Sequence, residues 1–579
     1  MLTALPRLGP APVFDVAVIG AGGAGMSAAV MAAADGARVL LVEATAHLGG
    51  TTALSAGTTW VVGSHHAAGV NPRDSVEQAA TFLDHAVGGR ADPALRAAFL
   101  RHGADAVAKI EQRSHLRYRA RPLHPDYLSE LPGSTLCGRA LEPLPFDGRL
   151  LGDDLALLRP PIPEFTVLGG MAVDRDDIFH LLRLRRSWAS LRYVAKILAR
   201  HAGDRLRGPR GTRLLMGNAL IGRLMLSARE RGITVMTDTR VTALHRDGGS
   251  VDGLTIEQAG QRVRVAVTGG IVMATGGFNR HPQRRAQRLP GIDATWSPAA
   301  PGHTGTLHEL AEAVGAHYAP TGLSDAFWAP VSTRRRPDGS TAAFPHFVFD
   351  RAKPGMVTVN QAGRRFVNES TSYHLFGLAM QAAHRQSPSI PAYLITDANG
   401  LRRYGLGMVR PGGHGLAPYL ADGYLTRAST LDALAATLGI DAAGLRDTVA
   451  RLNTAAQTGV DPDWQRGSTD YQRANGDAAW PGPNPTLGPI DTGPFYAVKL
   501  YPGDIGAATG FATDTDARAL DTAGRPIPGL YAVGNDAQSI MGGTYPGPGI
   551  TIGPGLVFAY LAARDAVGRS RRAGLKTAA

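Results

Sequence analysis

The chain has 579 residues, of which 44% are hydrophobic and 19% are charged, with a formal net charge of +12. This composition is ordinary for globular proteins and excludes extended disorder and fibrous repeats. The single cysteine, Cys137, cannot form an intrachain disulfide, which argues against a thiol-rich metal or redox centre and favours a reducing compartment. The 72 glycines make up about 12% of the chain against a typical ~7%, so we expect the backbone to run close to other groups.

Neither a secretory segment nor a membrane span is expected. Residues 1–12 contain no apolar stretch after a basic one, so we expect a cytoplasmic protein. Two uncharged stretches, residues 16–34 and 537–563, are broken by glycines, and the second also contains three prolines. A membrane span of that kind would leave backbone groups without hydrogen bonds in lipid.

The first predicted elements are a strand, a helix and a second strand. Residues 14–20 and 38–43 are short apolar runs, and the alanine-rich residues 23–35 between them have helical character. Strands connected in this way are parallel and need cover on both faces, which predicts an α/β fold. The same strand-then-glycine pattern recurs at residues 270–278 and 529–535. We therefore expect one discontinuous, Rossmann-like nucleotide-binding domain assembled from the beginning, middle and end of the chain.

A glycine motif joins the first predicted strand to the helix. Gly20, Gly22 and Gly25 form the pattern G-x-G-x-x-G, and Glu43 closes the next strand. In this context the first glycine permits a tight turn, the second lets backbone N–H groups reach a pyrophosphate, and the third lets helix and strand pack closely. The Glu43 carboxylate can accept hydrogen bonds from ribose hydroxyls. The motif therefore predicts a dinucleotide cofactor.

The composition changes twice further along the chain. Residues 71–211 are charged, helical and loop-like, and we expect them to form an insertion that covers the ligand. Residues 325–500 combine β-rich runs with a helical tract, which predicts an α+β catalytic domain. The expected organisation is a nucleotide-binding domain over residues 1–324 and 501–579, with the domain over 325–500 inserted into it.

The positive charge is concentrated in residues 183–210, which carry nine basic residues against one aspartate. Apolar residues recur there at three- and four-residue steps, as expected of a basic amphipathic helix: Leu184, Trp188, Leu191, Ala195 and Leu198. Two interpretations stay open. The helix either packs its apolar face on the body and exposes the charges, or makes a peripheral contact with an anionic membrane surface. Nucleic acid is not expected, because no aromatic interleaving or binding motif accompanies the charge.

Glycines and small hydroxyl residues continue after Glu43, at residues 49–57. Here the chain resembles the FAD-containing flavoproteins of the fumarate reductase and 3-ketosteroid dehydrogenase superfamily. The resemblance continues at residues 272–278, 302–305 and 529–535, and thus covers nearly the whole chain. It implies that the dinucleotide is FAD. The residues implied to contact FAD are Gly20, Gly22, Gly23, Ala24, Gly25, Glu43, Gly49, Gly50, Thr51, Thr52, Ser55, Ala56, Gly57, Val241, Ala274, Thr275, Gly276, Gly534, Asn535, Thr551 and Ile552.

Residues 545–554 resemble the segment that distinguishes 3-ketosteroid Δ1-dehydrogenases within that superfamily. Two prolines hold such a loop extended, while Gly547 and Gly549 leave their N–H groups uncovered. The Tyr545 hydroxyl and the Gly549 N–H, four residues apart, can then converge on one carbonyl oxygen. Together they would form an oxyanion hole.

Two further segments fit the same family. Residues 368–373 resemble the segment that carries its catalytic base, which places that role on Tyr373, and residues 125–127 resemble the segment that supplies a second active-site tyrosine, Tyr127. The resemblance implies that Tyr373 removes the C2 proton of a 3-ketosteroid while the C1 hydride passes to flavin N5. We expect a hydrogen bond from Tyr127 to lower the pKa of Tyr373. Candidates to line an apolar substrate pocket are Phe327, Trp328, Phe347 and Phe349.

The expected partners are a 3-ketosteroid substrate and an external, quinone-like electron acceptor. Three alternatives stay open: a fumarate- or enoate-type reductase, which would need an arginine acid and cationic clamps for carboxylates; a 3-ketosteroid 4-ene (5α) dehydrogenase; and a non-catalytic FAD-bearing protein that binds membrane surfaces. No metal site is expected, because His65 and His66 have no further ligand at metal-ligand spacing in the sequence.

Overall fold

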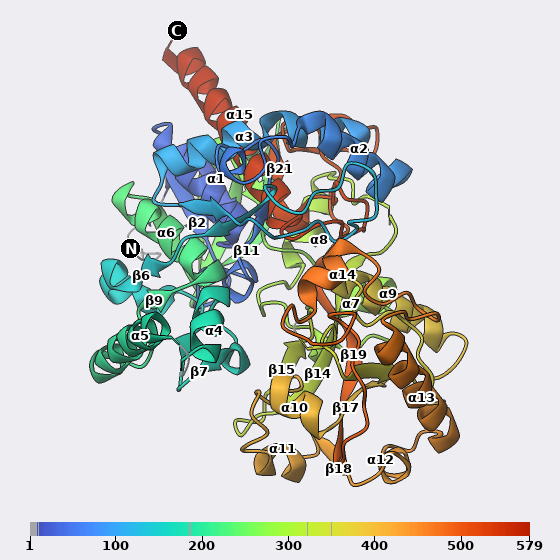
Figure 1. Cartoon of the computed structure of the whole chain (residues 1–579). Helices are drawn as coiled ribbons and strands as arrows, with labels where there is room; N and C mark the ends of the chain where they lie inside the picture. The colour runs from blue at the N-terminus through green and yellow to red at the C-terminus, as the bar shows by residue number, and fades with distance from the viewer. Residues whose placement is uncertain (1–7, 10, 185–186, 321, 349, 579) are drawn as a thin grey trace.

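The computed structural model describes residues 8–9, 11–184, 187–320, 322–348 and 350–578. Figure 1 shows one body around α1, β2 and α15 and a second body, drawn in green to orange, around β14, β17 and β19. Helices α4 and α5 lie beside them as a third group. None of the helices in the described ranges is both long and apolar enough to cross a bilayer.

The first body is built on an eight-stranded sheet that contains the beginning, middle and end of the chain. Its parallel strands lie in the order β10 (Thr234–Met236), β2 (Val39–Val42), β1 (Val13–Ile19), β13 (Gln261–Met273) and β21 (Pro526–Ala532). Three antiparallel strands complete it, namely β12 (Ser250–Gln258) and β11 (Arg240–Asp247) beside β13, and β20 (Arg518–Leu520) beside β21. This arrangement confirms the predicted α/β fold with a parallel sheet.

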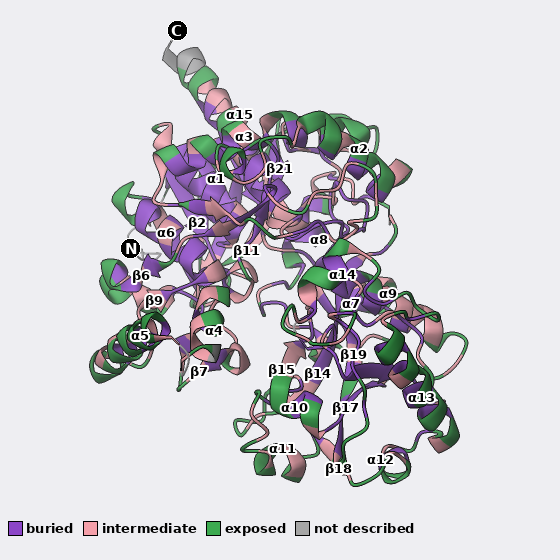
Figure 2. Cartoon of the chain, viewed as in Figure 1, coloured by how far each residue is buried: buried purple, intermediate pink, exposed green. Residues whose placement is uncertain are grey.

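Both faces of this sheet are buried, as the apolar runs predict. In β1, Val16 and Val18 face one hydrophobic cluster, whereas Ala17 and Ile19 face another. The first cluster is formed with the helices α1 (Gly23–Ala34), α2 (Val76–Val87), α3 (Pro93–Arg113), α6 (Met216–Glu230) and α15 (Ile552–Ala578). The second is formed with β11, β12 and α8 (Thr306–Ala313). The buried residues of α1 and the strands beside it stand out in Figure 2.

The second body contains an antiparallel sheet. Its strands lie in the order β15 (Thr341–Pro345), β14 (Ala326–Arg335), β19 (Phe495–Ala507), β17 (Ala392–Thr396) and β16 (Met356–Val359), and β18 (Thr426–Ala428) also pairs with β19. Leu394 packs toward α9 (Tyr373–His384) and α10 (Ala398–Tyr404), while its neighbour Ile395 packs toward α12 (Leu431–Leu438) and α13 (Ala442–Thr458). Helices therefore cover both faces of this sheet as well.

Short elements connect the two bodies and the third group. A small sheet has the order β3 (Thr59–Trp60), β5 (Ala140–Pro143) and β4 (Tyr118–Ala120). Two further antiparallel pairs are β6 (Phe146–Asp147) with β9 (Arg213–Leu214), and the hairpin of β7 (Thr166–Val167) with β8 (Met171–Ala172). The remaining helices are α4 (Arg175–Leu182), α5 (Trp188–Arg207), α7 (Pro282–Arg288), α11 (Ala417–Ala421) and α14 (Asp470–Asn475).

The basic segment forms the predicted helix and buries one face, but that face is not the predicted apolar stripe. The buried positions of α5 are Ser190, Val194, Ile197, His201 and Asp204. The apolar stripe expected to pack inward is instead turned to the surface.

Exposed positions of that stripe include Trp188, Leu191, Ala195 and Leu198. Polar anchors explain the difference. The buried Asp204 carboxylate accepts hydrogen bonds from Thr212, and the His201 Nε2 atom lies 2.9 Å from the Leu168 carbonyl oxygen. Arg185 and Arg186 lie outside the described residues.

Candidate functional site

The glycine turn forms at the carboxyl end of β1, where α1 begins. A Cβ on Gly25 would lie 1.9 Å from the Gly20 carbonyl oxygen, so only glycine allows this approach. A Cβ on Gly22 would meet none of the described atoms within 4 Å. Gly22 caps α1 without a side-chain hydrogen bond, and the space beside its Cα atom is open. This helix start fits the pyrophosphate of a dinucleotide.

Glu43 lies at the end of β2 beside this turn. One of its carboxylate oxygens accepts the Ala21 N–H at 3.0 Å, and the other accepts the N–H and hydroxyl of Thr45 at 2.9 and 2.7 Å. These three hydrogen bonds use three of the roughly four acceptor positions of a carboxylate. One acceptor position therefore remains, and the contact of Glu43 with a ribose hydroxyl stays a prediction.

The loop of residues 49–57 packs against the same helix start. The Gly49 N–H donates to the Ala21 carbonyl at 2.8 Å, and the Thr52 hydroxyl oxygen accepts the Gly23 N–H at 3.1 Å. Gly50 is close to Gly22, since a Cβ on Gly50 would lie 3.3 Å from the Gly22 Cα atom. Thr51 is held by His303 and by the Ala300 N–H.

Not every residue predicted to contact FAD lies at this turn. Ser55 bonds within its own loop, to the Thr52 carbonyl and the Gly57 N–H, and Ala56 is exposed. Val241 pairs with Ile256 in the β11–β12 hairpin and packs on the second hydrophobic cluster. No described contact joins Val241 to the glycine turn.

A buried carboxylate that sequence reasoning missed joins the ends of β13 and β21. Asp536 accepts hydrogen bonds from the backbone and hydroxyl of Thr275 and from the Gly277 N–H, and it lies 2.9 Å from His308 Nε2. Burial alone would raise the pKa of Asp536, but these hydrogen bonds hold it below the usual value. Asp536 follows the predicted Gly534 and Asn535 directly, and this position was its only signal in the sequence.

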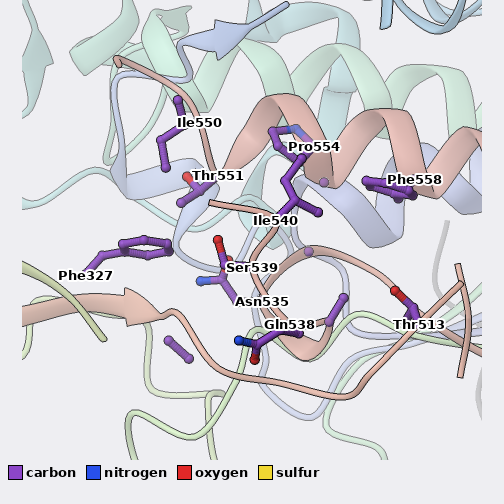
Figure 3. A pocket seen from close by; sticks show the side chains of 14 residues that line it. Phe327, Thr513, Asn535, Gln538, Ser539, Ile540, Ile550, Thr551, Pro554 and Phe558 are labelled. Carbon is purple, nitrogen blue, oxygen red and sulfur yellow. The ribbon is translucent and has the colours of Figure 1, made fainter. Parts of the chain in front are cut away.

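A pocket opens between the end of β21 and the start of α15 (Figure 3). The predicted cofactor residues Gly534, Asn535 and Thr551 line it together with Phe327. Figure 3 shows the side chains of Asn535 and Thr551 on the same side of the pocket as the Phe327 ring. The Phe327 ring also contacts that of Tyr545, so one wall of the pocket packs against the predicted catalytic tyrosines, which do not themselves line it.

The three predicted tyrosines come together in one buried cluster. The Tyr127 hydroxyl donates to the Tyr373 oxygen at 3.2 Å. The ring centroid of Tyr545 lies 5.8 Å from that of Tyr127 and 5.1 Å from that of Tyr373. The Tyr545 hydroxyl also bonds with those of Tyr373 and Thr551. Segments that are far apart in the sequence therefore share one chain of hydroxyls.

The expected lowering of the Tyr373 pKa is wrong for this arrangement. Burial is the main cause that raises the pKa of Tyr373 well above its usual value, and the neighbouring Tyr127 and Tyr545 raise it further. Burial likewise raises the pKa values of Tyr127 and Tyr545. A neutral phenol donor stabilises a phenolate less than removal from water destabilises it.

Tyr127 is anchored by a buried ion pair network. Its N–H donates to the Pro546 carbonyl at 2.7 Å, which ties it to the Tyr545 segment. The adjacent Asp126 accepts the Trp60 indole N–H at 2.7 Å and an Arg139 N–H at 2.9 Å, and Arg139 also pairs with Asp74. Burial raises the pKa of Asp126 to about 6 despite the attraction of Arg139.

Tyr373 begins α9 and follows a second buried network. Glu369 is fully buried and accepts hydrogen bonds from Arg365, Arg466 and the Thr358 N–H. Arg365 also forms two hydrogen bonds with Asp461, at 3.0 and 2.8 Å. Because removing one partner would leave a buried charge unpaired, these pairs fix the segment before Tyr373.

Gly549 occupies a position that only glycine fits. Its φ is +89°, and a Cβ would lie 2.3 Å from the Thr58 carbonyl oxygen. Its own carbonyl accepts the Trp60 N–H at 3.2 Å. The strand β3 therefore holds the loop that carries the predicted oxyanion donor.

The four residues predicted to line the substrate pocket do not all lie together. The ring centroid of Phe327 lies 5.1 Å from that of Tyr545, and the ring centroid of Phe347 lies 5.0 Å from that of Tyr373. Trp328 points to the other face of β14, where its indole N–H donates to Ser324 at 2.7 Å, and unlike Phe327 it does not line the pocket of Figure 3, so its assignment to the substrate stays an unsupported prediction. Neighbouring strand residues point to opposite faces, which explains the difference. Phe349 lies outside the described residues.

Three further residues at the cluster carried no motif in the sequence. The Tyr471 ring centroid lies 4.9 Å from that of Tyr127, and the His374 ring centroid lies 6.1 Å from that of Tyr545. Burial lowers the pKa of His374 to about 4, so this ring is neutral near pH 7. The buried guanidinium of Arg351 acts electrostatically on the Tyr471 phenol.

The sequence offers no third ligand at metal-ligand spacing from His65 and His66, but the fold brings one to them. Glu111, on α3, lies within ion-pair distance of both imidazoles. The sequence separation of more than forty residues hid this contact.

The profile of the FAD binding domain family matches residues 15–552. The chain is 37% identical to a 4-oxocyclohex-2-ene-1-carboxylate 5-dehydrogenase from Sinomonas cyclohexanicum, over 95% of this chain and 93% of that protein. It is 36% identical to a 3-oxosteroid 1-dehydrogenase from Mycolicibacterium smegmatis, over 95% of this chain and 97% of that protein.

A similar fold is found in the crystal structure of the 3-ketosteroid Δ1-dehydrogenase from Sterolibacterium denitrificans in complex with 1,4-androstadiene-3,17-dione. The TM-score is 0.90 at 33% identity, with 96% of this chain and 99% of that chain covered. FAD fits the open helix start at Gly22 and the free acceptor position of Glu43. The chain thus belongs to the FAD binding domain family, has FAD as its cofactor, and is an oxidoreductase that acts on CH–CH groups.

Proposed function

We propose that this enzyme introduces the C1–C2 double bond into 3-ketosteroids. The observation that carries the proposal is the buried cluster of Tyr127, Tyr373 and Tyr545 beside the pocket that the cofactor segment lines. Its apolar surroundings suit a steroid ring. The similarity to steroid dehydrogenases over almost the whole chain supports the same substrate class.

In this proposal Tyr545 and Gly549 bind the C3 carbonyl oxygen. The phenol and the backbone N–H each donate one hydrogen bond, which stabilises the negative charge that develops on oxygen when C2 loses its proton. Thr551 and β3 hold the two donors in place. FAD, when bound, supplies the acceptor for the C1 hydride.

Tyr373 is the proposed base for the C2 proton, and Tyr127 is the residue that positions it. Because Tyr127 donates to the Tyr373 oxygen, that hydrogen bond orients the phenol toward the cluster. The raised pKa of Tyr373 means that few molecules carry the phenolate near pH 7. As the pH rises toward the pKa, the phenolate fraction grows about tenfold for each pH unit. The proposed reaction is therefore favoured at alkaline pH.

A second candidate substrate is a cyclic ketone that carries a carboxylate. The Nη2 atom of the buried Arg351 has no hydrogen-bond partner among the described residues, and neither has the Tyr471 hydroxyl. Tyr471 contacts Tyr127, so these two groups border the tyrosine cluster. A guanidinium and a phenol suit a carboxylate, and the Sinomonas cyclohexanicum relative is a 4-oxocyclohex-2-ene-1-carboxylate dehydrogenase.

We also propose that α5 contacts an anionic phospholipid surface. Trp188 is 81% and Leu206 is 90% exposed, and exposed basic residues alternate with them on the same helix: Arg192, Lys196, Arg205 and Arg207. Figure 2 shows this helix as mostly exposed. Exposed apolar side chains between cations match the boundary between anionic headgroups and acyl chains.

Anaerobic mixing of the FAD-loaded enzyme with ring ketones tests the substrate class. We expect 3-ketosteroids to bleach the flavin absorption band and to yield products lighter by two hydrogens at C1 and C2. Bleaching by 4-oxocyclohexanecarboxylates and not by steroids would replace the first candidate with the second. A flavin that neither ketone reduces would overturn both.

The variant Tyr373→Phe tests the assignment of the base. We expect kcat to fall by roughly 10²- to 10⁴-fold, the usual contribution of a general base. In the wild type, kcat/KM should rise with pH above neutral, since the base must lose its proton; the variant should lose this rise. Tyr393→Phe removes a phenol that bonds to the Leu438 carbonyl in the second body, and serves as the control. Near-normal turnover of Tyr373→Phe would remove this residue from the role.

Vesicle sedimentation tests the membrane contact. The wild type should bind vesicles that contain phosphatidylglycerol, bind less at high salt, and ignore pure phosphatidylcholine. Trp188→Ala should weaken binding by about tenfold or more, because a large apolar side chain no longer enters the lipid. Trp464→Ala, at a partly exposed tryptophan of the second body, is the matched control. Equal binding by the two variants would contradict the assignment to α5.

A further inference from the structure

Two histidines and a glutamate that the proposed reaction does not use converge on the first body. His65 and His66 lie in the turn after β3, and Glu111 lies in the last turn of α3. One Glu111 oxygen, Oε2, is 3.1 Å from His65 Nε2 and 2.9 Å from His66 Nε2. The three potential ligand atoms all lie within 4.8 Å of one another.

This geometry resembles the ligand side of a metal centre. The two imidazole centroids are only 3.9 Å apart, and both rings direct Nε2 to the same carboxylate oxygen. Ligands at about 2.0–2.1 Å from a tetrahedral zinc ion lie roughly 3.3 Å from each other. The two spacings from Glu111 to the histidines are close to that value and the third lies within 4.8 Å, so small side-chain movements would admit an ion between the three atoms.

We propose that His65, His66 and Glu111 bind one divalent transition-metal ion, with Zn²⁺ as the expected occupant. Two imidazoles and a carboxylate are a ligand set that zinc accepts, and water would complete the coordination. The His65 side chain is 55% exposed and the Glu111 side chain is 8% exposed, so an ion can enter from solvent to a carboxylate that is already desolvated.

The carboxylate is also held in position. The other Glu111 oxygen, Oε1, accepts the Tyr118 N–H at 2.9 Å, and the Tyr118 hydroxyl lies 2.9 Å from the Thr59 hydroxyl. Hydrogen bonds behind a ligand commonly fix its orientation toward a metal. These contacts leave Oε2 directed to the histidines.

The position of the site suggests what the ion does. It would tie the turn after β3 to α3, five residues beyond Trp60. The Trp60 N–H donates to the carbonyl of Gly549, so β3 supports the loop beside the tyrosine cluster. The ion would therefore brace the first body, and this binding does not depend on which ketone the enzyme uses.

Calorimetric titration of the untagged, FAD-loaded and chelator-treated enzyme with ZnCl₂ tests the site. We expect one equivalent to bind and to raise the melting temperature. His66→Ala should weaken binding by more than about tenfold, because loss of a hydrogen bond to a metal ligand already lowers metal affinity about 10- to 100-fold. Glu111→Gln should weaken it similarly. His414→Ala, at an exposed histidine of the second body, should bind as the wild type does.

Circular dichroism and FAD content establish that each variant is folded before its titration is interpreted. His66→Ala carries the test, because Glu111 also bonds to the backbone of Tyr118. The proposal is overturned if the wild type binds no zinc. It is equally overturned if wild type and His66→Ala bind zinc with the same affinity.

Discussion

The site depends on removing three phenols from water at the junction of the two bodies. Tyr127, Tyr373 and Tyr545 are contributed by a loop, a helix start and the C-terminal segment, and their hydroxyls share one chain of hydrogen bonds. Burial makes every charge there costly and every hydrogen bond stronger. The same desolvation that raises the pKa of Tyr373 would strengthen the stabilisation of a developing oxyanion.

Fixed charges elsewhere hold the phenols in this environment. Asp126, Arg139 and Asp74 anchor the Tyr127 loop, while Glu369 and its arginines anchor the turn before Tyr373. These networks hold in position the two segments that carry Tyr127 and Tyr373. Backbone contacts complete the frame, since the Tyr127 N–H bonds to Pro546 and the Trp60 N–H bonds to Gly549. A ring ketone would therefore meet donors that need little reorganisation.

Local patterns in the sequence predicted the parallel sheet, because strand length, glycine spacing and alternating burial are local properties. The three tyrosines that the fold brings together came from the resemblance to the 3-ketosteroid dehydrogenase family, because a single tyrosine in a loop carries no local signal of its role. The outward apolar stripe of α5, the rotation of Trp328 away from the pocket and the approach of Glu111 to His65 depend on contacts between distant segments. The prediction of a lowered pKa for Tyr373 was wrong for the same reason, because the loss of water around the hydroxyl depends on how the distant segments pack around it.

The most direct test is a crystal structure of the FAD-loaded enzyme with a bound ring ketone. The account predicts that the ketone oxygen lies within about 3.2 Å of both the Tyr545 hydroxyl oxygen and the Gly549 nitrogen, with the adjacent CH₂ group facing Tyr373. A ketone bound with its oxygen out of reach of both donors would contradict the account.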